Sequence, residues 1–263
     1  MLDSPCYIVS DLHLGVAPPE VERRFVAFTE MVDAEGGALV VNGDLFDFWF
    51  EWRTVIPRTG YRALAALARL TERERRVVWL AGNHDCWGGD VLREDVGAEF
   101  VDEWRGTVAG WRAFVHHGDG LRAVEDRKYR RLRTVLRHPL AIRAFRFLHP
   151  DLGSRLATGS SAASRSHGDR GHDEGAGLQR VAFELLDAPS GPELVVFGHS
   201  HVAALARAPG GGVYANAGSW LDSPTYLRVT AERVELRRLR DSAGEGELLH
   251  ALDRITKESL AER

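Results

Sequence analysis

The sequence predicts an α/β fold in which short buried strands alternate with amphipathic helices. Three observations support this fold class. Short, largely apolar runs alternate with segments of helical spacing along the 263-residue chain. Apolar residues make up 44% of the chain and charged residues 27%, a balance typical of soluble globular proteins and not of disordered ones. Five of the apolar runs also end in Asp, His or Asn beside Gly, where open α/β sheets bind their ligands.

The first half of the chain is predicted to contain four strands and two helices. The strands are the largely apolar runs Cys6–Val9, Ala38–Val41, Val77–Leu80 and Trp111–Val115. A helix is predicted over Pro18–Ala34, because one face of that segment collects the apolar side chains Val21, Phe25, Phe28 and Val32. The Ala and Leu spacing of Tyr61–Leu70 predicts a second helix.

The second half of the chain returns to strands. Leu194–Phe197 is a buried apolar run, and further strands are predicted from about Gly212 to Leu239. We expect the last stretch, Glu247–Leu260, to form a terminal helix.

A long basic segment separates the two halves. Leu121–Leu156 has a helical composition, and its prolines, Pro139 and Pro150, predict a division into two or three helices. The next stretch, Ala157–Gly177, is rich in Gly, Ser and Ala and is predicted to be a flexible loop. Because both segments lie between strands, we expect a single domain over residues 1–263 with an insertion at 121–177.

Polar clusters follow five of the predicted strands. Their side chains converge on one site if the strands end at a common edge. Any one of these residues alone is explained as a turn former or a packed histidine. Five clusters that each follow a strand are not explained in this way. The candidates are Asp11, His13, Asp44, Asn83, His84, His117, His199 and His201.

Imidazoles and carboxylates together indicate a site for divalent metals such as Zn, Fe or Mn. The donors are too many for one tetrahedral ion and suit two ions that share a carboxylate. Two ions about 3.5–4 Å apart hold both the attacking and the leaving oxygen in phosphoryl transfer, and they activate water at neutral pH. Glycines beside the donors let the backbone turn sharply and approach the ions.

The same residues form five motifs that are typical of one enzyme family. In chain order they are D-x-H (Asp11, His13), G-D (Gly43, Asp44), G-N-H-D (Gly82–Asp85), H-G-D (His117–Asp119) and G-H-x-H (Gly198–His201). In this order they make the chain resemble the calcineurin-like metallophosphoesterases over about Ile8 to Trp220. The resemblance implies a β-sandwich flanked by helices, in a four-layer αββα arrangement.

The resemblance also implies a role for each motif residue. One ion would be held by Asp11, His13, Asp44 and His201, and the second by Asp44, Asn83, His117 and His199, with Asp44 as the bridge. The implied catalytic residues are Asn83, His84 and Asp85. Of these, His84 would donate a proton or stabilise charge at the reacting oxygen, with Asp85 as its orienting partner. Mn suits such mixed N and O ligands, and Zn, Fe and Co are the alternatives.

Residues beside the motifs have plainer interpretations. Neighbours on a strand point to opposite faces, so we take His117 as the ligand and His116 as structural. Asp47, in GDLFD, either supports the site from behind or caps a turn. Cys86 is expected to be a small packing residue. Four further histidines match no motif and are expected to be solvated or packed: His138, His149, His167 and His172.

Charge is unevenly distributed along the chain. The whole chain has 34 basic and 38 acidic residues, a net charge of −4. Leu121–Leu156 has ten basic and three acidic residues, or +7, which leaves −11 for the remainder. Apolar residues are interleaved with these arginines. The pattern suits a basic amphipathic helix at a membrane surface, and equally an ordinary surface helix pair with solvated arginines.

A second resemblance concerns the insertion. H-G-D-x-L followed by D-x-x-Y (His117–Leu121, Asp126–Tyr129) is similar to the UDP-2,3-diacylglucosamine diphosphatase branch, and the run RHPLAIRAFRFLHPDLGSRLA is similar to sequences grouped with it. That branch cleaves a nucleotide–diacyl sugar pyrophosphate to UMP and a lipid monophosphate in lipid A synthesis, beneath a helical cap. The implied substrate contacts are Asp126, Tyr129, Arg130 and Arg133. His84 stands where that branch has Arg, and 157–177 contains no Lys where that branch has a Lys-bearing helix.

Three functions follow as hypotheses. The first is a two-metal pyrophosphatase that acts on a nucleotide-linked lipid. The second is a phosphodiesterase or phosphatase of the same fold that acts on soluble nucleotides or other phosphoesters. The third is a non-catalytic scaffold that binds partners, which the intact donor set disfavours.

We expect a cytoplasmic protein with peripheral contact to the inner face of the plasma membrane. Two cysteines favour a reducing compartment. The first residues, MLDSPCYIVSDLHLG, lack the basic start and apolar core of a signal peptide. No apolar run approaches the roughly 20 residues that span a bilayer. The mild net charge argues against a dedicated nucleic-acid partner.

Overall fold

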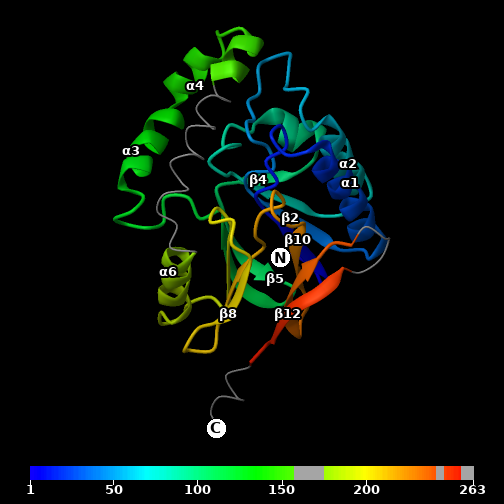
Figure 1. The fold of residues 1–263 in the computed structure, drawn as a ribbon, viewed down its shortest axis with the longest axis vertical. Coiled ribbons are helices and arrows are strands. Elements are labelled where there is room, and N and C mark those ends of the chain that lie inside the picture. The colour runs from blue at the N-terminus through cyan, green and yellow to red at the C-terminus, as the bar shows by residue number, and fades with distance from the viewer. Residues whose placement is uncertain (157–174, 241–245, 256–263) are drawn as a thin grey trace.

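The protein consists of two β-sheets packed face to face, with helices on both outer faces (Figure 1). The computed structural model describes residues 1–156, 175–240 and 246–255. Two helices pack on the outer face of the larger sheet, and a third packs on the outer face of the smaller sheet. The predicted α/β fold class is therefore confirmed, in the four-layer αββα arrangement that the family resemblance implies.

The larger sheet has seven strands and is parallel on one side. Its order is β12 (Glu247–Asp253), β11 (Arg233–Arg238), β10 (Thr225–Val229), β1 (Cys6–Val9), β2 (Ala38–Asn42), β3 (Val77–Leu80) and β4 (Glu99–Val101). Strands β1 to β4 run parallel, and β10 to β12 are antiparallel to their neighbours. Helices α1 (Pro19–Ala34) and α2 (Tyr61–Glu72) cover its outer face.

The smaller sheet has five strands. Its order is β5 (Glu103–Val108), β6 (Trp111–His116), β7 (Leu194–Phe197), β9 (Val213–Asn216) and β8 (Ala204–Arg207). The three central strands run parallel to one another, and the two edge strands are antiparallel to them. Helix α6 (Ala176–Leu186) covers the outer face of this sheet.

Strand β1 shows how the two sheets share the core. Tyr7 and Val9 pack with the helices of the outer layer, whereas Cys6 and Ile8 pack between the two sheets. Because both faces of the strand are buried, its sequence is a continuous apolar run and not an alternating one. Helix α1 buries the four side chains that its periodicity singles out, Val21, Phe25, Phe28 and Val32.

The basic segment after β6 forms separate helices beside the sheets. Helix α3 (Arg127–Leu136) and helix α4 (Pro139–Phe145) are divided near Pro139, and a third helical stretch covers 150–156, as the two prolines predict. We call residues 121–156 the cap. Figure 1 shows α3 and α4 standing away from the sheets, on the side opposite α1 and α2. Most of the predicted flexible loop, residues 157–174, lies outside the described residues, while Ala176 and Gly177 already belong to α6.

Two predictions about elements need correction or completion. In the described part of the predicted terminal helix, Glu247–Asp253 is strand β12, and its backbone pairs with β11. Residues 256–260 of that prediction lie outside the described residues. Leu, Ala and Glu favour a helix locally, but pairing with an open sheet edge overrides that propensity. The edge strands β4, β5 and β8 and a π-helical turn at Val91–Asp95 were not anticipated, because these short segments carry weak apolar patterns. Among the described helices, none combines the length and apolar character needed to cross a bilayer.

Candidate metal centre

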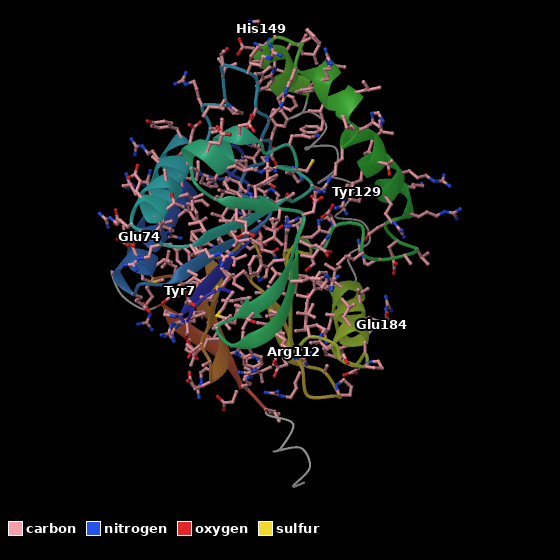
Figure 2. The ribbon with its side chains drawn as sticks, turned by 180° about the vertical axis from the view of Figure 1, so that it is seen from behind. Tyr7, Glu74, Arg112, Tyr129, His149 and Glu184 are labelled. Atoms are coloured by element: carbon pink, nitrogen blue, oxygen red, sulfur yellow. The ribbon has the colours of Figure 1, made fainter. Side chains whose placement is uncertain are left out.

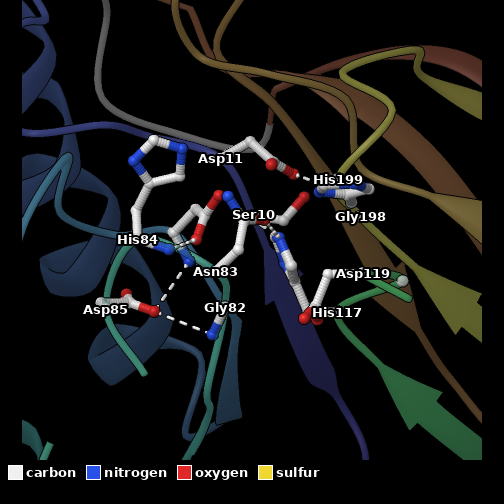
Figure 3. Close-up of polar contacts among 12 residues, drawn as sticks. Ser10, Asp11, Gly82, Asn83, His84, Asp85, His117, Asp119, Gly198 and His199 are labelled. Atoms are coloured by element: carbon white, nitrogen blue, oxygen red, sulfur yellow. Dashed lines mark hydrogen bonds and ion pairs between the residues drawn. The ribbon is translucent and has the colours of Figure 1, made fainter. Parts of the chain in front are cut away.

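Five strands from both sheets end at the candidate metal centre (Figure 3). Parallel β1, β2 and β3 place the residues that follow them at one edge of the larger sheet, and parallel β6 and β7 do the same in the smaller sheet. A hydrogen bond joins the two edges: the backbone N–H of His199 donates to the side-chain oxygen Asp11 Oδ2 at 3.1 Å. The convergence expected from the sequence is therefore present in the structure.

The backbone at these strand ends is unusually strained. Five of the seven predicted metal ligands have left-handed backbone, with φ between 49° and 63°: Asp11, His13, Asp44, His199 and His201. Non-glycine residues rarely adopt this conformation, and such strain gathers at functional sites where the surrounding structure enforces it.

Glycines allow the donor side chains to approach closely. A Cβ atom on Gly82 would lie 2.1 Å from Asp44 Oδ1, and one on Gly43 would lie 2.4 Å from His117 Nδ1. No side chain larger than hydrogen fits at either position without moving a donor. These two glycines of the G-D and G-N-H-D motifs therefore shape the site directly.

One donor group gathers around Asp11. The Nε2 atoms of His13 and His201 lie 3.1 Å apart, and His201 Nε2 lies 3.4 Å from Asp11 Oδ1. Asp11 Oδ1 is buried and has no hydrogen-bond partner among the described residues. A buried carboxylate oxygen facing two imidazole nitrogens is the arrangement expected of ligands to a cation.

The other donor group gathers around His117. Its Nε2 lies 3.3 Å from Asp44 Oδ2 and 3.2 Å from Asn83 Oδ1, while its Nδ1 lies 2.8 Å from the Asn42 carbonyl oxygen. Donation of Nδ1–H to that carbonyl leaves Nε2 as a lone-pair donor. The ring of His199 lies 5.3 Å from that of His117, centroid to centroid, and completes the predicted set on this side.

Three groups of donor atoms are close enough to hold an ion, each within 4.8 Å of one another. They are Asp11 with His13 and His201, Asp11 with Asp44 and His117, and His13 with Asp44 and His84. Asp44 belongs to two of these groups, one on each side, which is consistent with its predicted bridging position.

The electrostatics of the site favour positive charge. Burial opposes the ionised form of Asp44, yet His117 and His84 hold the pKa of its carboxyl well below the usual value. Burial lowers the pKa of His13 to about 4, so its imidazole is neutral. Burial also opposes a charged His117, but Asp44 and Asp11 raise the pKa of this imidazole well above its usual value. The ionised Asp44 and the neutral His13 are in the forms that bind metals, and a divalent cation would displace the proton that the two carboxylates hold on His117. The residues present therefore suit a divalent cation.

Asp85 does not orient His84, which corrects the role inferred for it. Its fully buried carboxylate accepts hydrogen bonds from the backbone N–H groups of Asp44, Leu45 and Gly82, at 2.8 to 3.2 Å, and from Trp79 Nε1 at 3.3 Å. Figure 3 shows the His84 ring pointing away from it. Adjacent residues in a tight turn point in different directions, so Asp85 ties the two motif loops together instead.

His84 lies beside the donors, where its predicted role requires it. Its backbone N–H donates to Asp44 Oδ1 at 2.9 Å, and its Nδ1 lies 2.9 Å from the Asp47 carbonyl oxygen. Its ring meets the ring of His13 edge-to-face at 5.0 Å. The neighbouring histidines at the start of the H-G-D motif have different partners, since His116 Nδ1 accepts the Gly118 N–H at 2.8 Å, whereas His117 Nε2 lies beside Asp44 and Asn83.

Most of the residues predicted to contact the substrate bind other residues of the protein in this structure. Asp126 is buried and pairs with the Arg122 guanidinium at 2.8 Å, and Tyr129 donates its hydroxyl to Asp119 Oδ2 at 2.6 Å. Arg133 lies 3.7 Å from the same Asp119 oxygen, whereas Arg130 is exposed on α3. Asp119 thus connects the cap to the loop that carries His117. Its position in the H-G-D motif was the signal from which this role could have been inferred.

An aromatic cluster attaches the other cap helix, α4, and was not predicted from the sequence. Phe145 of α4 stacks on Trp87 with ring centroids 5.6 Å apart and contacts Phe48, Phe50 and Trp52. These partners lie in the loops after β2 and β3, which also carry Asp44 and His84. The cap is therefore attached to three of the loops that form the site.

Comparison with known proteins places the chain in a family. A family model described as calcineurin-like phosphoesterase matches residues 4–203. A UDP-2,3-diacylglucosamine hydrolase of Porphyromonas gingivalis is 35% identical over 172 residues, which cover 64% of this chain and 66% of that protein. Proteins of the same name from Nitrosococcus oceani and Shewanella piezotolerans are 28% and 25% identical, covering 76% and 88% of this chain and 79% and 96% of their own lengths. Because the family match includes every strand end that carries a candidate donor, the chain belongs to the calcineurin-like phosphoesterase family.

Proposed function

We propose that this hydrolase cleaves the pyrophosphate of a UDP-2,3-diacylglucosamine-like nucleotide–lipid and releases UMP and a lipid monophosphate. The family is one of phosphoesterases that use divalent metal ions, and the similar proteins described above carry the name of this activity. The observation that carries the proposal is the convergence of carboxylate and imidazole donors from five strand ends, whose loops Tyr129 and Phe145 join to a basic cap.

Two divalent ions, with Mn preferred over Zn, Fe or Co, are the proposed cofactors. Asp11, His13, Asp44 and His201 would hold one ion, and Asp44, Asn83, His117 and His199 the other. When bound, such a pair polarises the phosphoryl oxygens and makes a water nucleophilic at neutral pH. The Asn42 carbonyl keeps His117 in the ligand-competent tautomer, and the Asp85 carboxylate holds the loops that position Asp44.

His84 is the proposed proton donor or charge stabiliser at the reacting phosphate. The Asp47 carbonyl fixes its Nδ1, so the other ring nitrogen is available to the substrate. Asn83 precedes it on the same turn, and its amide oxygen already contacts His117. Cations held by Asp44 and His117 would attract the anionic phosphate, which would then lie next to His84 and Asn83.

The cap is the proposed binding surface for the lipid and for an anionic membrane. Large apolar side chains on it are exposed to solvent, including Val124 at 81%, Leu140 at 70% and Phe147 at 84%. Arginines flank them, and Figure 2 shows nitrogen-tipped side chains projecting from the side of α3 that faces away from the sheets. Exposed apolar side chains ringed by arginine suit a peripheral position on the inner face of the plasma membrane.

A cavity beside the cap offers room for an acyl chain. It has a volume of about 940 Å³ and lies between α4 and the loop at residues 52–55. Its walls combine apolar groups such as Trp52, Ile142 and Phe147 with the guanidinium groups of Arg143 and Arg146. Such walls would hold a hydrocarbon chain and meet a phosphate at the rim.

The test is turnover of UDP-2,3-diacylglucosamine in detergent micelles, with bis-p-nitrophenyl phosphate as the soluble comparison. We expect metal-dependent release of UMP from the lipid substrate, little turnover of the soluble diester, and loss of activity after chelation. Turnover of the soluble diester alone would instead support the second candidate, a phosphodiesterase or phosphatase acting on soluble phosphoesters. His84 favours that candidate, because it stands where the nucleotide–lipid branch has Arg.

A further inference from the structure

One tryptophan links both cap helices to the turn that carries Asn83 and His84. Trp87 comes three residues after His84 in the chain. Its Nε1–H donates to the carbonyl oxygen of Leu136, the last residue of α3, at 2.9 Å. Its ring stacks on Phe145 of α4, with centroids 5.6 Å apart and ring planes at 27°. A single side chain of this turn therefore contacts both helices of the cap.

The indole of Trp87 supplies a hydrogen-bond donor to the end of α3. The last four carbonyl groups of an α-helix have no partner within the helix, and Trp87 Nε1–H pairs with one of them. The same ring meets Phe48 and Phe50 edge-to-face, with centroids 6.0 and 5.7 Å apart. The junction between α3 and α4 is therefore attached to Trp87 by a polar contact and by aromatic contacts.

The turn is also attached to the loop after β2. Gly82–Trp87 lies outside the helices and strands, so contacts with other segments determine its position. The Asp85 carboxylate accepts the backbone N–H groups of Asp44 and Leu45, at 3.2 and 2.9 Å. Only one residue separates Asp85 from Trp87. The turn is therefore held from two directions, by the loop that carries Asp44 and by the cap.

The position of this turn determines how its functional groups meet those of other strands. Asn83 Oδ1 lies 3.2 Å from His117 Nε2, and the His84 N–H donates to Asp44 Oδ1 at 2.9 Å. His117 follows β6 and Asp44 follows β2, so a displaced turn changes both distances. A misplacement of about 1 Å can cost on the order of 100-fold in rate.

We infer that Trp87 is a positioning residue that holds the turn of Asn83 and His84 in place through its contacts with the cap. Through Asn83 it acts on the ion proposed beside His117, and through His84 it acts on the reacting phosphate. The ion proposed beside His201 has no proposed ligand on this turn and serves as an internal comparison. The inference rests on the proposed metal centre but not on the identity of the substrate.

The experiment titrates metal-free protein with Mn²⁺ in a calorimeter and compares the parent with Trp87→Phe and Trp87→Leu. Phe removes the indole N–H and keeps a ring that stacks on Phe145, whereas Leu removes both contacts. We expect one of the two ions to bind about 2–10-fold more weakly in Trp87→Phe, the range that corresponds to one neutral hydrogen bond. Trp87→Leu should weaken the same ion further, because the aromatic contacts are lost as well. The other ion should bind as in the parent in both variants.

Trp52→Phe is the matched control. Trp52 also donates its indole N–H to a carbonyl oxygen of the cap, that of Leu148 at 3.1 Å, and its ring lies 6.1 Å from that of Phe145. It lies on the loop after β2, eight residues beyond Asp44, and not on the turn of His84. Trp52→Phe should therefore loosen the cap and leave the affinity for both ions as in the parent.

Turnover of UDP-2,3-diacylglucosamine gives a second readout. We expect kcat to fall by up to about tenfold in Trp87→Phe. Trp52→Phe should instead raise KM and keep kcat within about twofold, because Trp52 lies in the wall of the proposed acyl cavity. Failure of the parent to turn over this substrate would refute the proposed substrate and leave the Mn²⁺ titration to decide the role of Trp87.

The titration has outcomes that overturn the inference. Unchanged affinity for both ions in a folded Trp87→Leu variant is one, and in Trp87→Phe if only that variant folds. An equal loss of affinity in Trp52→Phe is another, because it would show a general effect of loosening the cap. Failure of the parent to bind Mn²⁺ would refute both the metal centre and the role of Trp87.

Discussion

The hydroxyl of Tyr129 donates a 2.6 Å hydrogen bond to the buried carboxylate of Asp119, and this bond attaches cap helix α3 to the loop that carries His117. Burial and the charge of Asp119 raise the pKa of Tyr129 far above its usual value, so the phenol stays protonated and donates. The other oxygen of Asp119 has no hydrogen-bond partner among the described residues, which makes the Tyr129 bond more important to this carboxylate.

Tyr129→Phe should therefore destabilise the protein by about 1.5–3 kcal/mol, the usual contribution of a hydrogen bond to a charged group. Urea unfolding measures this directly. Tyr61→Phe is the control, because Tyr61 is 67% exposed on α2 and its substitution should change the free energy of unfolding by less than about 0.5 kcal/mol. Equal stabilities of the two variants would contradict the proposed attachment of α3.

Phe145→Ala should loosen the cap and leave the sheets intact. The ring stacks on Trp87 and contacts aromatic side chains of two site loops, so its removal leaves α4 without its main apolar contact. Because Phe145 is only partly buried, we expect a loss below the roughly 3–5 kcal/mol of a fully buried Phe→Ala change. Hydrogen exchange should accelerate in α3 and α4 and stay unchanged in α1.

The control for this change is Leu140→Ala on the same helix, where the side chain is 70% exposed. It should leave hydrogen exchange as in the parent. Faster exchange in α1 together with α4 after Phe145→Ala would show general destabilisation, contrary to the local role proposed for this ring.

His84→Ala should slow turnover by about 10²–10⁴-fold, the usual contribution of a positioned acid or base, while both ions remain bound. Metal analysis decides the point, because a donor atom of His84 also lies within 4.8 Å of donors on His13 and Asp44. Loss of one ion from the purified variant would show that His84 is a ligand and not a proton donor.

Replacing Arg127, Arg130 and Arg131 together by Gln should weaken binding to vesicles rich in anionic lipid. All three are exposed on α3, and each charge near the surface contributes about 1 kcal/mol. The expected loss is on the order of 100-fold in partition coefficient, shrinking as salt is added. Arg133 and Arg137 are unsuitable for this test, because they pair with Asp119 and Asp102.

The matched control removes three exposed arginines from the opposite side of the molecule: Arg23, Arg62 and Arg69. It should leave vesicle binding unchanged. Equal weakening in both triple variants would indicate a response to net charge alone, and no weakening in either would favour solvated arginines over membrane contact.

Helices and strands with a clear apolar pattern of their own could be predicted from the sequence. Strands that form only by pairing with a neighbouring strand could not. Buried parallel strands such as Val77–Leu80 appear as continuous apolar runs, and the polar residues after them must share an edge. Strand β12 could not be recognised, because ELLHALD has the composition of a helix and becomes a strand only beside β11. Strand β8, with the sequence ALAR, has no β-branched residue to mark it.

The same distinction holds for the candidate site: its donors could be predicted from the sequence, and the directions of its side chains could not. The donors were identifiable from Gly-flanked motifs, because close approach of ligands requires glycine at positions such as Gly82. Side-chain directions were not, so Asp85 was assigned to His84 although its carboxylate accepts backbone N–H groups. Phe145 connects the cap to the site through contacts with segments far apart in the chain, and no local pattern encodes such contacts. Asp119 lies only ten residues before its partner Tyr129, and its place in the H-G-D motif was the available signal.

The central claim is a metal centre in which Asp44 serves both ions, and one measurement tests it most directly. Purified parent and Asp44→Ala are compared for bound Mn²⁺, fold by circular dichroism, and turnover of UDP-2,3-diacylglucosamine. The account predicts two ions and metal-dependent turnover for the parent, and for a folded Asp44→Ala at most one ion with turnover reduced to background. Retained turnover in a folded Asp44→Ala would contradict the two-ion centre.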